Sequence, residues 1–400
     1  MAATAAGETP AVRAGSFRPR HLDQIDWIRA LTTVGVIAVH SVFFTNPPNS
    51  VGAGAVISLL HYTREAFMFM TGVVLFYSYY PRLGPVGRFW RRRFLLIGLP
   101  YAIWSAIYVG LSVPLWPVGR FAVHWGLALV TGSAWYHLYY LLITMQIYLL
   151  MPWAVFFLQR TRRWHGWMLA ASALAEAALM AYYQYALPAH GFWAHLLAYR
   201  NMAWFSYQFY ILLGALTAIH LDQVNAWVRA HGRPLLAAWL ASVGLAWAWY
   251  GFNHWALHQP VITASAVLQP FMVPYCFFWI LVLYRWGLTW AEQGRHWRIS
   301  PAIKSISRLS FGIYLLHPLV LWLALRYVVP PLHRLPGLVV TPLTIALTLL
   351  VSWAVIGLVA RTPLALPLLG QRGAATSAPT VRPARTPWTP VLADEGSGRR

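Results

Sequence analysis

The sequence has little charge, and especially little negative charge. Only 10% of its 400 residues are charged, with nine Asp and Glu against 30 Lys and Arg. A soluble globular protein carries about 25% charged residues. Because 59% of this chain is hydrophobic, a soluble fold would leave too few polar side chains to cover its outside. The composition therefore indicates a protein embedded in lipid.

Cysteine is nearly absent, and the single one, Cys276, lies inside an apolar run. One cysteine can form neither an intrachain disulfide nor a cysteine metal site. We expect a buried, inert thiol and no metal site. The first 26 residues contain no apolar core, so we also expect no cleavable signal peptide.

The net charge of +21 does not indicate a nucleic-acid partner, because the arginines lie between apolar runs and not on one amphipathic face. If the N-terminus is cytoplasmic, 24 of the 30 Lys and Arg fall in the termini and cytoplasmic loops. Four fall on the other side, and Arg29 and Arg64 lie within spans. Cytoplasmic loops of membrane proteins carry an excess of Lys and Arg. We therefore expect both termini in the cytoplasm.

Ten apolar runs approach the roughly 20 residues that a helix needs to span a bilayer. They are residues 27–45, 56–79, 94–115, 135–157, 167–183, 202–219, 235–250, 262–284, 311–329 and 338–360. The run 121–130 is too short to span and is interpreted as an interfacial or re-entrant helix. The sequence thus predicts an all-α polytopic membrane protein with about ten transmembrane helices.

Composition divides the chain into three parts. Residues 1–24 are predicted to be a cytoplasmic segment, and 25–370 a membrane domain. Residues 371–400 are rich in Pro, Ala, Thr, Gly and Arg, a composition typical of a disordered tail.

Ionisable residues inside spans are costly and are candidates for function. They are Arg29, His40, His61, Arg64, Glu65, His137, Glu176 and His317. Two alternatives stay open at this point. His61 and His137 lie near span ends, where a histidine can sit at the level of the lipid headgroups, and Glu176 can have a structural role.

Arg29 and His40 form the most distinctive pair. Their spacing of 11 residues returns a helix to within about 20° of the same face, with about 16 Å between them along the axis. We expect both side chains to face the same interior, with Arg29 near the cytoplasm and His40 in the outer half of the membrane.

Glu65 is predicted to lie at a depth similar to that of His40, in a hydrocarbon core about 30 Å thick. A carboxylate that orients an imidazole is a recurrent arrangement in acyl transfer. We hypothesise that Glu65 pairs with His40. Pairing with the neighbouring Arg64, or with His61 one turn away, is an equal alternative.

Two further motifs each have two interpretations. In SFGIYLLHP (residues 310–318), Tyr314 and His317 share a helix face before a proline, so they either support a kinked packing contact or line a cavity. In GRFWRRRF (residues 87–94), Arg91, Arg92 and Arg93 either set topology and contact anionic lipid, or bind the phosphates of a cytoplasmic donor such as coenzyme A.

Five segments, in this order, resemble the acyltransferase 3 family of integral membrane acyltransferases. They are the Arg29–His40 run, FMFMTGVVLF (67–76), the arginine-rich segment that ends in Pro100–Tyr101, WYHLYYLLITMQIYLLMP (135–152), and SFGIYLLHP. The resemblance extends from Asp23 to about Leu369. Thr71 stands where the family usually has Ser, and Ile97 where many members have a further Arg.

The resemblance implies an enzyme of a bacterial-type inner membrane. Such an enzyme transfers acetyl, or a similarly short acyl group, from cytoplasmic acyl-CoA to a hydroxyl of a carbohydrate or cell-envelope glycan. Acyl-CoA is the donor substrate, no cofactor is permanently bound, and membrane lipid surrounds residues 25–370.

The resemblance also assigns roles to individual residues. His40 acts as general base or accepts the acyl group itself, and Arg29 positions the donor or stabilises developing negative charge. Donor phosphates meet the run Arg91, Arg92 and Arg93. From their positions in the spans, we also expect a catalytic role for Glu65 and substrate contacts for Tyr314 and His317. Two competing classes remain: a transporter of a glycan or lipid intermediate without covalent chemistry, and a non-catalytic membrane scaffold.

Overall fold

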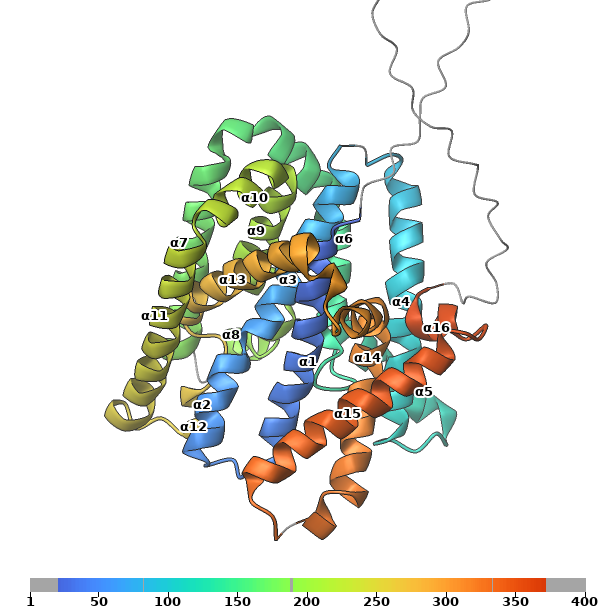
Figure 1. The fold of residues 1–400 in the computed structure, drawn as a ribbon. Coiled ribbons are helices and arrows are strands. Elements are labelled where there is room, and N and C mark those ends of the chain that lie inside the picture. Colours follow the sequence, from blue (N-terminus) through green and yellow to red (C-terminus); the bar gives the residue numbers. More distant parts are fainter. Residues whose placement is uncertain (1–20, 82, 188–189, 333, 372–400) are drawn as a thin grey trace, which may run out of the picture.

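The computed structural model describes residues 21–371, except 82, 188, 189 and 333. Within this part of the chain every regular element is a helix (Figure 1). The all-α prediction is therefore confirmed. The proposed disordered tail, except Gln371, and most of the N-terminal segment lie outside the described residues.

Within the described residues, seven helices are long and apolar enough to cross a membrane. They are α1 (Asp23–Thr45), α4 (Val86–Gly110), α6 (Tyr139–Arg160), α11 (Gly232–Gly251, continued by a π-helical turn, Phe252–Ala256), α13 (Met272–Gln293), α14 (Ser300–Tyr327) and α15 (Gly337–Val359). An eighth span is possible if α9 (Gln208–Ile219) and α10 (Leu221–Ala230), bent by 100° against each other, are counted as one. The protein is thus a polytopic membrane protein.

The expected number of about ten spans is larger than these seven or eight. The second predicted run is broken at His61 into α2 (Val51–Leu60) and α3 (Tyr62–Tyr79), and the fifth forms α7 (His165–Tyr185). Both runs are helical, but α3 carries Arg64 and Glu65 and α7 carries Glu176, and these charged groups lower their mean hydropathy.

The remaining helices of the described chain are short. They are α5 (Val118–Thr131), α8 (Phe192–Leu197), α12 (Val261–Ala264) and α16 (Ala365–Leu369). Helix α5 covers the run 121–130, which was expected to be too short to span. The run 262–284 was expected to be one helix, and this is wrong: α12 ends at Ala264 and α13 begins only at Met272.

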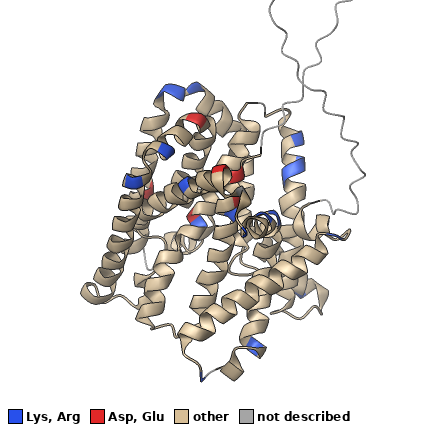
Figure 2. Ribbon diagram, viewed as in Figure 1, with Lys and Arg blue, Asp and Glu red and all other residues tan. Residues whose placement is uncertain are grey.

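Helix α1 lies at the centre of the packing and contacts α3, α13, α14 and α15 (Figure 1). Figure 2 shows that the described Lys and Arg gather mainly in the half of the molecule drawn at the top, around the ends of α4, α7 and α10. We call this the basic end. Its assignment to the cytoplasm, and with it the cytoplasmic location of both termini, stays a prediction of the positive-inside rule.

Helices α3 and α9 cross in very close contact. A Cβ atom on Gly72 would run into the backbone oxygen of Ile211, and one on Gly214 into the backbone oxygen of Phe69. Small residues let membrane helices approach one another in this way. Gly72, which belongs to the motif FMFMTGVVLF, is therefore a packing requirement that fixes the position of Phe67 and Thr71 on α3.

Candidate active site

Arg29 and His40 line two successive cavities along α1. Arg29 borders a cavity of about 290 Å³, which we call the arginine cavity. His40 borders one of about 160 Å³, the histidine cavity. The aromatic side chains Phe67, Tyr140 and Tyr314 line both. The two residues thus face adjoining cavities, as expected from their spacing on one helix.

The arginine cavity takes its positive charge from three helices. Arg29 comes from α1, Arg93 from α4 and Arg308 from α14. The Arg93 guanidinium lies 4.9 Å from the Tyr79 ring centre and 5.7 Å from that of Tyr148. Such cation–π contacts hold a guanidinium while leaving its N–H groups free to bind an anion.

A small polar network holds the Arg29 side chain in place. Its Nη1 lies 3.7 Å from Oδ1 of Asp26. The same carboxylate oxygen accepts a 2.7 Å hydrogen bond from Ser307, and the other oxygen of Asp26 contacts His21 at 2.6 Å. This network joins the start of α1 to α14 and fixes where the guanidinium enters the cavity.

The run of three arginines on α4 is not one site. Arg91 and Arg92 are exposed, and Arg93 alone of the three lines the arginine cavity. Helical geometry explains this, because successive residues point about 100° apart. Arg91 and Arg92 are placed where they contact solvent or lipid headgroups, which was the other interpretation of this motif.

The histidine cavity lies beside three imidazole rings in contact. His40 stacks on His317, with 5.6 Å between ring centres and 23° between planes, and His317 meets His137 edge-on at 5.5 Å. Tyr136 packs on the other side of His40, at 4.5 Å. His137 and His317 are buried, whereas His40 is half-buried. His40 is therefore the member of the cluster with surface to offer a substrate.

Hydrogen bonds fix the ring orientation of His317. Its Nδ1 lies 2.7 Å from the backbone oxygen of Tyr314, so Nδ1 carries the proton and donates. Its Nε2 and both ring nitrogens of His137 are buried without a hydrogen-bond partner among the described residues. The Tyr314 hydroxyl donates to the backbone oxygen of His137. Of the two interpretations of SFGIYLLHP, the structure shows cavity lining for Tyr314 and ring stacking for His317.

Glu65 pairs with Arg64, and within the described part of the chain it forms no hydrogen bond with His40. Its Oε1 accepts bonds from Arg64 Nε at 3.1 Å and Nη2 at 3.0 Å. His61, the other alternative partner, bonds the backbone oxygen of Ser265 at 2.7 Å. The hypothesised Glu65–His40 pair is thus replaced by a pair between sequence neighbours.

This pairing gives the histidine cavity a positive group that sequence reasoning did not assign to it. Arg64 lines the cavity, and its guanidinium lies 4.8 Å from the Tyr207 ring centre. Glu65 and Tyr207 therefore hold Arg64 in place from the far side.

Glu176 has a structural position. Its Oε2 accepts a 3.2 Å hydrogen bond from the backbone nitrogen of Phe209, in the first turn of α9. A carboxylate there satisfies a free N–H group and interacts favourably with the helix dipole. This is the structural alternative left open by the sequence.

A third cavity, of about 510 Å³, adjoins the histidine cavity on the side away from Arg29. His61 and Val267 line both. Its walls are mostly apolar, including Phe43 and Phe44, and we call it the apolar cavity. It also contains Arg200 and Asn201, whose Nε and Oδ1 atoms are buried without a partner among the described residues.

Sequence reasoning missed Tyr136 and Arg308 as lining residues. Tyr136 stands next to His137 in WYHLYYLLITMQIYLLMP, and this position in the motif could have identified it. Arg308 precedes Tyr314 by six residues. The apolar runs place Arg308 in a predicted cytoplasmic loop, whereas α14 begins at Ser300 and includes both residues.

Fold and site together define a class: an α-helical membrane protein with adjoining cavities, one lined by guanidinium groups and the next by imidazoles. The family model for an acyltransferase domain, acyltransferase 3, matches residues 22–357. The chain therefore belongs to the acyltransferase 3 family and is a membrane acyltransferase. Comparisons with curated proteins and with solved structures gave no match.

Proposed function

We propose that the protein transfers acetyl, or a similarly short acyl group, from acyl-CoA to a hydroxyl group of a carbohydrate or cell-envelope glycan. The observation that carries the proposal is the row of three cavities, each sharing lining residues with the next. Donor and acceptor approach from opposite ends of this row and meet at His40.

The donor enters through the arginine cavity. Coenzyme A is polyanionic, and Arg29, Arg93 and Arg308 give this cavity positive charge without an acidic residue among its described lining. The thioester passes Phe67, Tyr140 and Tyr314 to reach the histidine cavity. Arg29, about 16 Å from His40 along the helix, positions the donor and does not touch the reacting carbonyl.

The reaction takes place in the histidine cavity. His40 accepts the proton of the acceptor hydroxyl while the hydroxyl oxygen attacks the thioester carbonyl carbon. The carbonyl oxygen becomes an oxyanion, and Arg64 supplies positive charge on the wall of the same cavity. Collapse of the intermediate breaks the carbon–sulfur bond, and the leaving thiolate takes the proton from the His40 imidazolium.

The acceptor enters through the apolar cavity. The unpaired Asn201 Oδ1 and Arg200 Nε are suited to hydroxyl or anionic groups of a glycan. Phe43 and Phe44 offer faces for the apolar side of a sugar ring or for a lipid carrier. His61 stands where this cavity meets the histidine cavity.

The test is transfer from radiolabelled acetyl-CoA to glycan in membranes that contain the wild type, His40→Ala or a histidine control. The control is His220→Phe, because His220 pairs with His165 at 2.8 Å, away from the three cavities. We expect label in glycan from the wild type and the control, and almost none from His40→Ala. Equal labelling by all three would overturn the proposal.

A continuous row of cavities also suits a transporter of a glycan or lipid intermediate. Mass spectrometry of surface glycan separates the two functions. Loss of an acyl ester from otherwise intact glycan in a deletion strain supports the acyltransferase, and loss of the whole glycan supports the transporter.

A further inference from the structure

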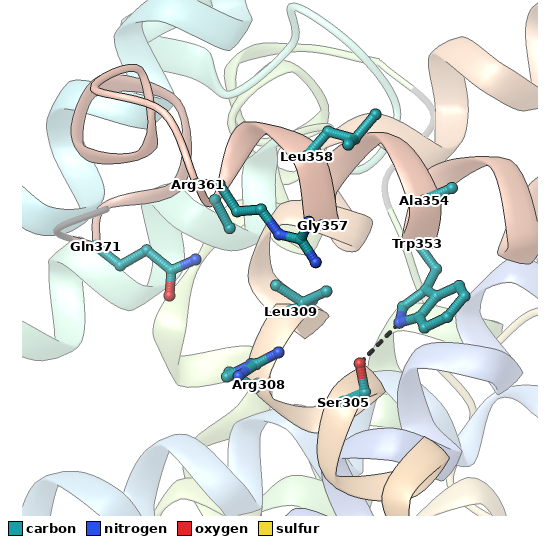
Figure 3. Close-up of a pocket in the computed structure, with 10 residues that line it drawn as sticks. Ser305, Arg308, Leu309, Trp353, Ala354, Gly357, Leu358, Arg361 and Gln371 are labelled. Carbon is teal, nitrogen blue, oxygen red and sulfur yellow. Dashed lines mark hydrogen bonds between the residues drawn. The ribbon is translucent and has the colours of Figure 1, made fainter. Parts of the chain in front are cut away.

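A fourth cavity lies between α14 and α15, next to the arginine cavity. It has a volume of about 510 Å³, and we call it the tryptophan pocket (Figure 3). Its polar lining consists of Ser305 and Arg308 from α14, Trp353 from α15, and Arg361 and Gln371 from the segments after α15 and α16. The volume lies within the range of about 300–1,000 Å³ that is typical of ligand sites.

The pocket is built for an anion. Arg308 and Arg361 approach it from different segments (Figure 3), and none of its described lining residues is acidic. Both arginines are exposed, so they are hydrated and free to exchange water for a ligand. A guanidinium presents a planar set of donors that matches a phosphate group with two parallel hydrogen bonds.

Trp353 gives the pocket a second, different kind of binding surface. Its indole Nε1 donates a 2.9 Å hydrogen bond to Ser305 Oγ (Figure 3), while 40% of the residue is exposed. The hydrogen bond holds the ring in place, so little freedom is lost when a ligand stacks on it. An ordered, exposed aromatic face next to guanidinium groups is suited to a nucleobase carrying phosphates.

The tryptophan pocket adjoins the arginine cavity, which leads toward His40 in the proposed route. Arg308 lines both this pocket and the arginine cavity. On α14, Arg308 and His317 are nine residues apart, which is about 14 Å along the helix axis. A ligand that reaches from the pocket to the imidazoles therefore needs a phosphorylated aromatic head and a long, narrow arm.

We propose that the tryptophan pocket binds the 3′-phosphorylated ADP end of acyl-CoA, with adenine against Trp353 and phosphates on Arg308 and Arg361. The pantetheine arm then runs through the arginine cavity toward His40. This inference rests on the proposed function, and it assigns the donor's nucleotide to α14 and α15, not to the exposed Arg91 and Arg92. An anionic lipid headgroup offers the same phosphate chemistry, and the experiment separates the two.

Binding of adenosine 3′,5′-bisphosphate, which keeps the adenine, the 3′-phosphate and the first 5′-phosphate of coenzyme A, tests the pocket without an acceptor. The protein is placed in nanodiscs of phosphatidylcholine, which has no net charge, and binding is measured by calorimetry. Losing hydrogen bonds to a charged group weakens binding about tenfold or more. We therefore expect Arg361→Ala and Trp353→Ala each to raise the Kd about tenfold, and Trp353→Phe to keep most of the affinity.

Arg298→Ala is the matched control, because Arg298 is exposed just before α14 and does not line the pocket. It should bind adenosine 3′,5′-bisphosphate as the wild type does. Unchanged affinity in Arg361→Ala, or no binding to the wild type, would overturn the inference. Loss of co-purifying phosphatidylglycerol in Arg361→Ala, with nucleotide affinity unchanged, would show a lipid site and also overturn it.

The outcome is distinguishable from failure of the proposed function. If the nucleotide binds and Arg361→Ala raises its Kd, but no acyl ester forms on any glycan, the pocket assignment is supported and the proposed acyl transfer is wrong. If acetyl-CoA donates its acetyl group and Arg361→Ala leaves the KM for acetyl-CoA unchanged, the acyl transfer is supported and the pocket assignment is wrong.

Discussion

The arginine cavity and the histidine cavity share Phe67, Tyr140 and Tyr314, but their polar groups differ. The first has three guanidinium groups and no histidine among its described lining residues. The second has three histidines, His40, His61 and His137, and a single guanidinium. Guanidinium groups, which are suited to bind anions, are thus separated from imidazoles, which are suited to transfer protons. Variants in the two cavities should therefore affect different kinetic constants.

His40→Ala should have the largest effect and leave donor binding unchanged. General-base catalysis contributes about 10²–10⁴-fold, so kcat should fall by that factor while the KM for acetyl-CoA stays the same. Initial rates of radiolabel transfer at several donor concentrations measure both constants. A raised KM with unchanged kcat would show that His40 binds the donor, as the arginines are proposed to do, and would contradict the division of roles between the two cavities.

Gly72→Ala should disturb both cavities together, because Gly72 sets the position of α3 against α9. The new Cβ meets backbone that cannot rotate away, and overpacking of this kind costs about 1–3 kcal/mol. We expect a lower melting temperature, a lower kcat and a higher KM. Gly244→Ala is the control, since nothing lies within 4 Å of its added Cβ. Equal melting temperatures for the two variants would contradict this account of the close crossing.

Arg93→Gln and Arg92→Gln sharpen the comparison within one helix. Arg93 lines the arginine cavity and Arg92 is exposed. Loss of a charged hydrogen-bond donor should raise the KM for acetyl-CoA about tenfold in Arg93→Gln. Exposed ion pairs are worth about 0–1 kcal/mol, so Arg92→Gln should have the smallest effect of all. A larger effect in Arg92→Gln would restore the arginine run as a single phosphate site.

The relation of Arg29 to His40 could be predicted from the sequence because it depends on one helix alone. The partner of Glu65 could not, because similar depth in the membrane does not decide between neighbours. Arg64, adjacent in the chain, forms the bond. The break of the second predicted run at His61 could not be predicted either. Hydropathy locates apolar runs, but it does not show where tertiary contacts interrupt a helix.

Access of water to the two cavities tests the central claim most directly, and it needs no knowledge of the acceptor. Cys276 is the only cysteine and is fully buried, so a new cysteine can be labelled selectively. Thr71→Cys lies in the arginine cavity and Val39→Cys in the histidine cavity. We predict that a membrane-impermeant thiol reagent labels Thr71→Cys only from the basic end, and that acetyl-CoA protects it. Val39→Cys should be labelled only from the opposite end. Labelling of both from the same end, or of neither, would contradict a route in which donor and acceptor meet at His40 from opposite sides.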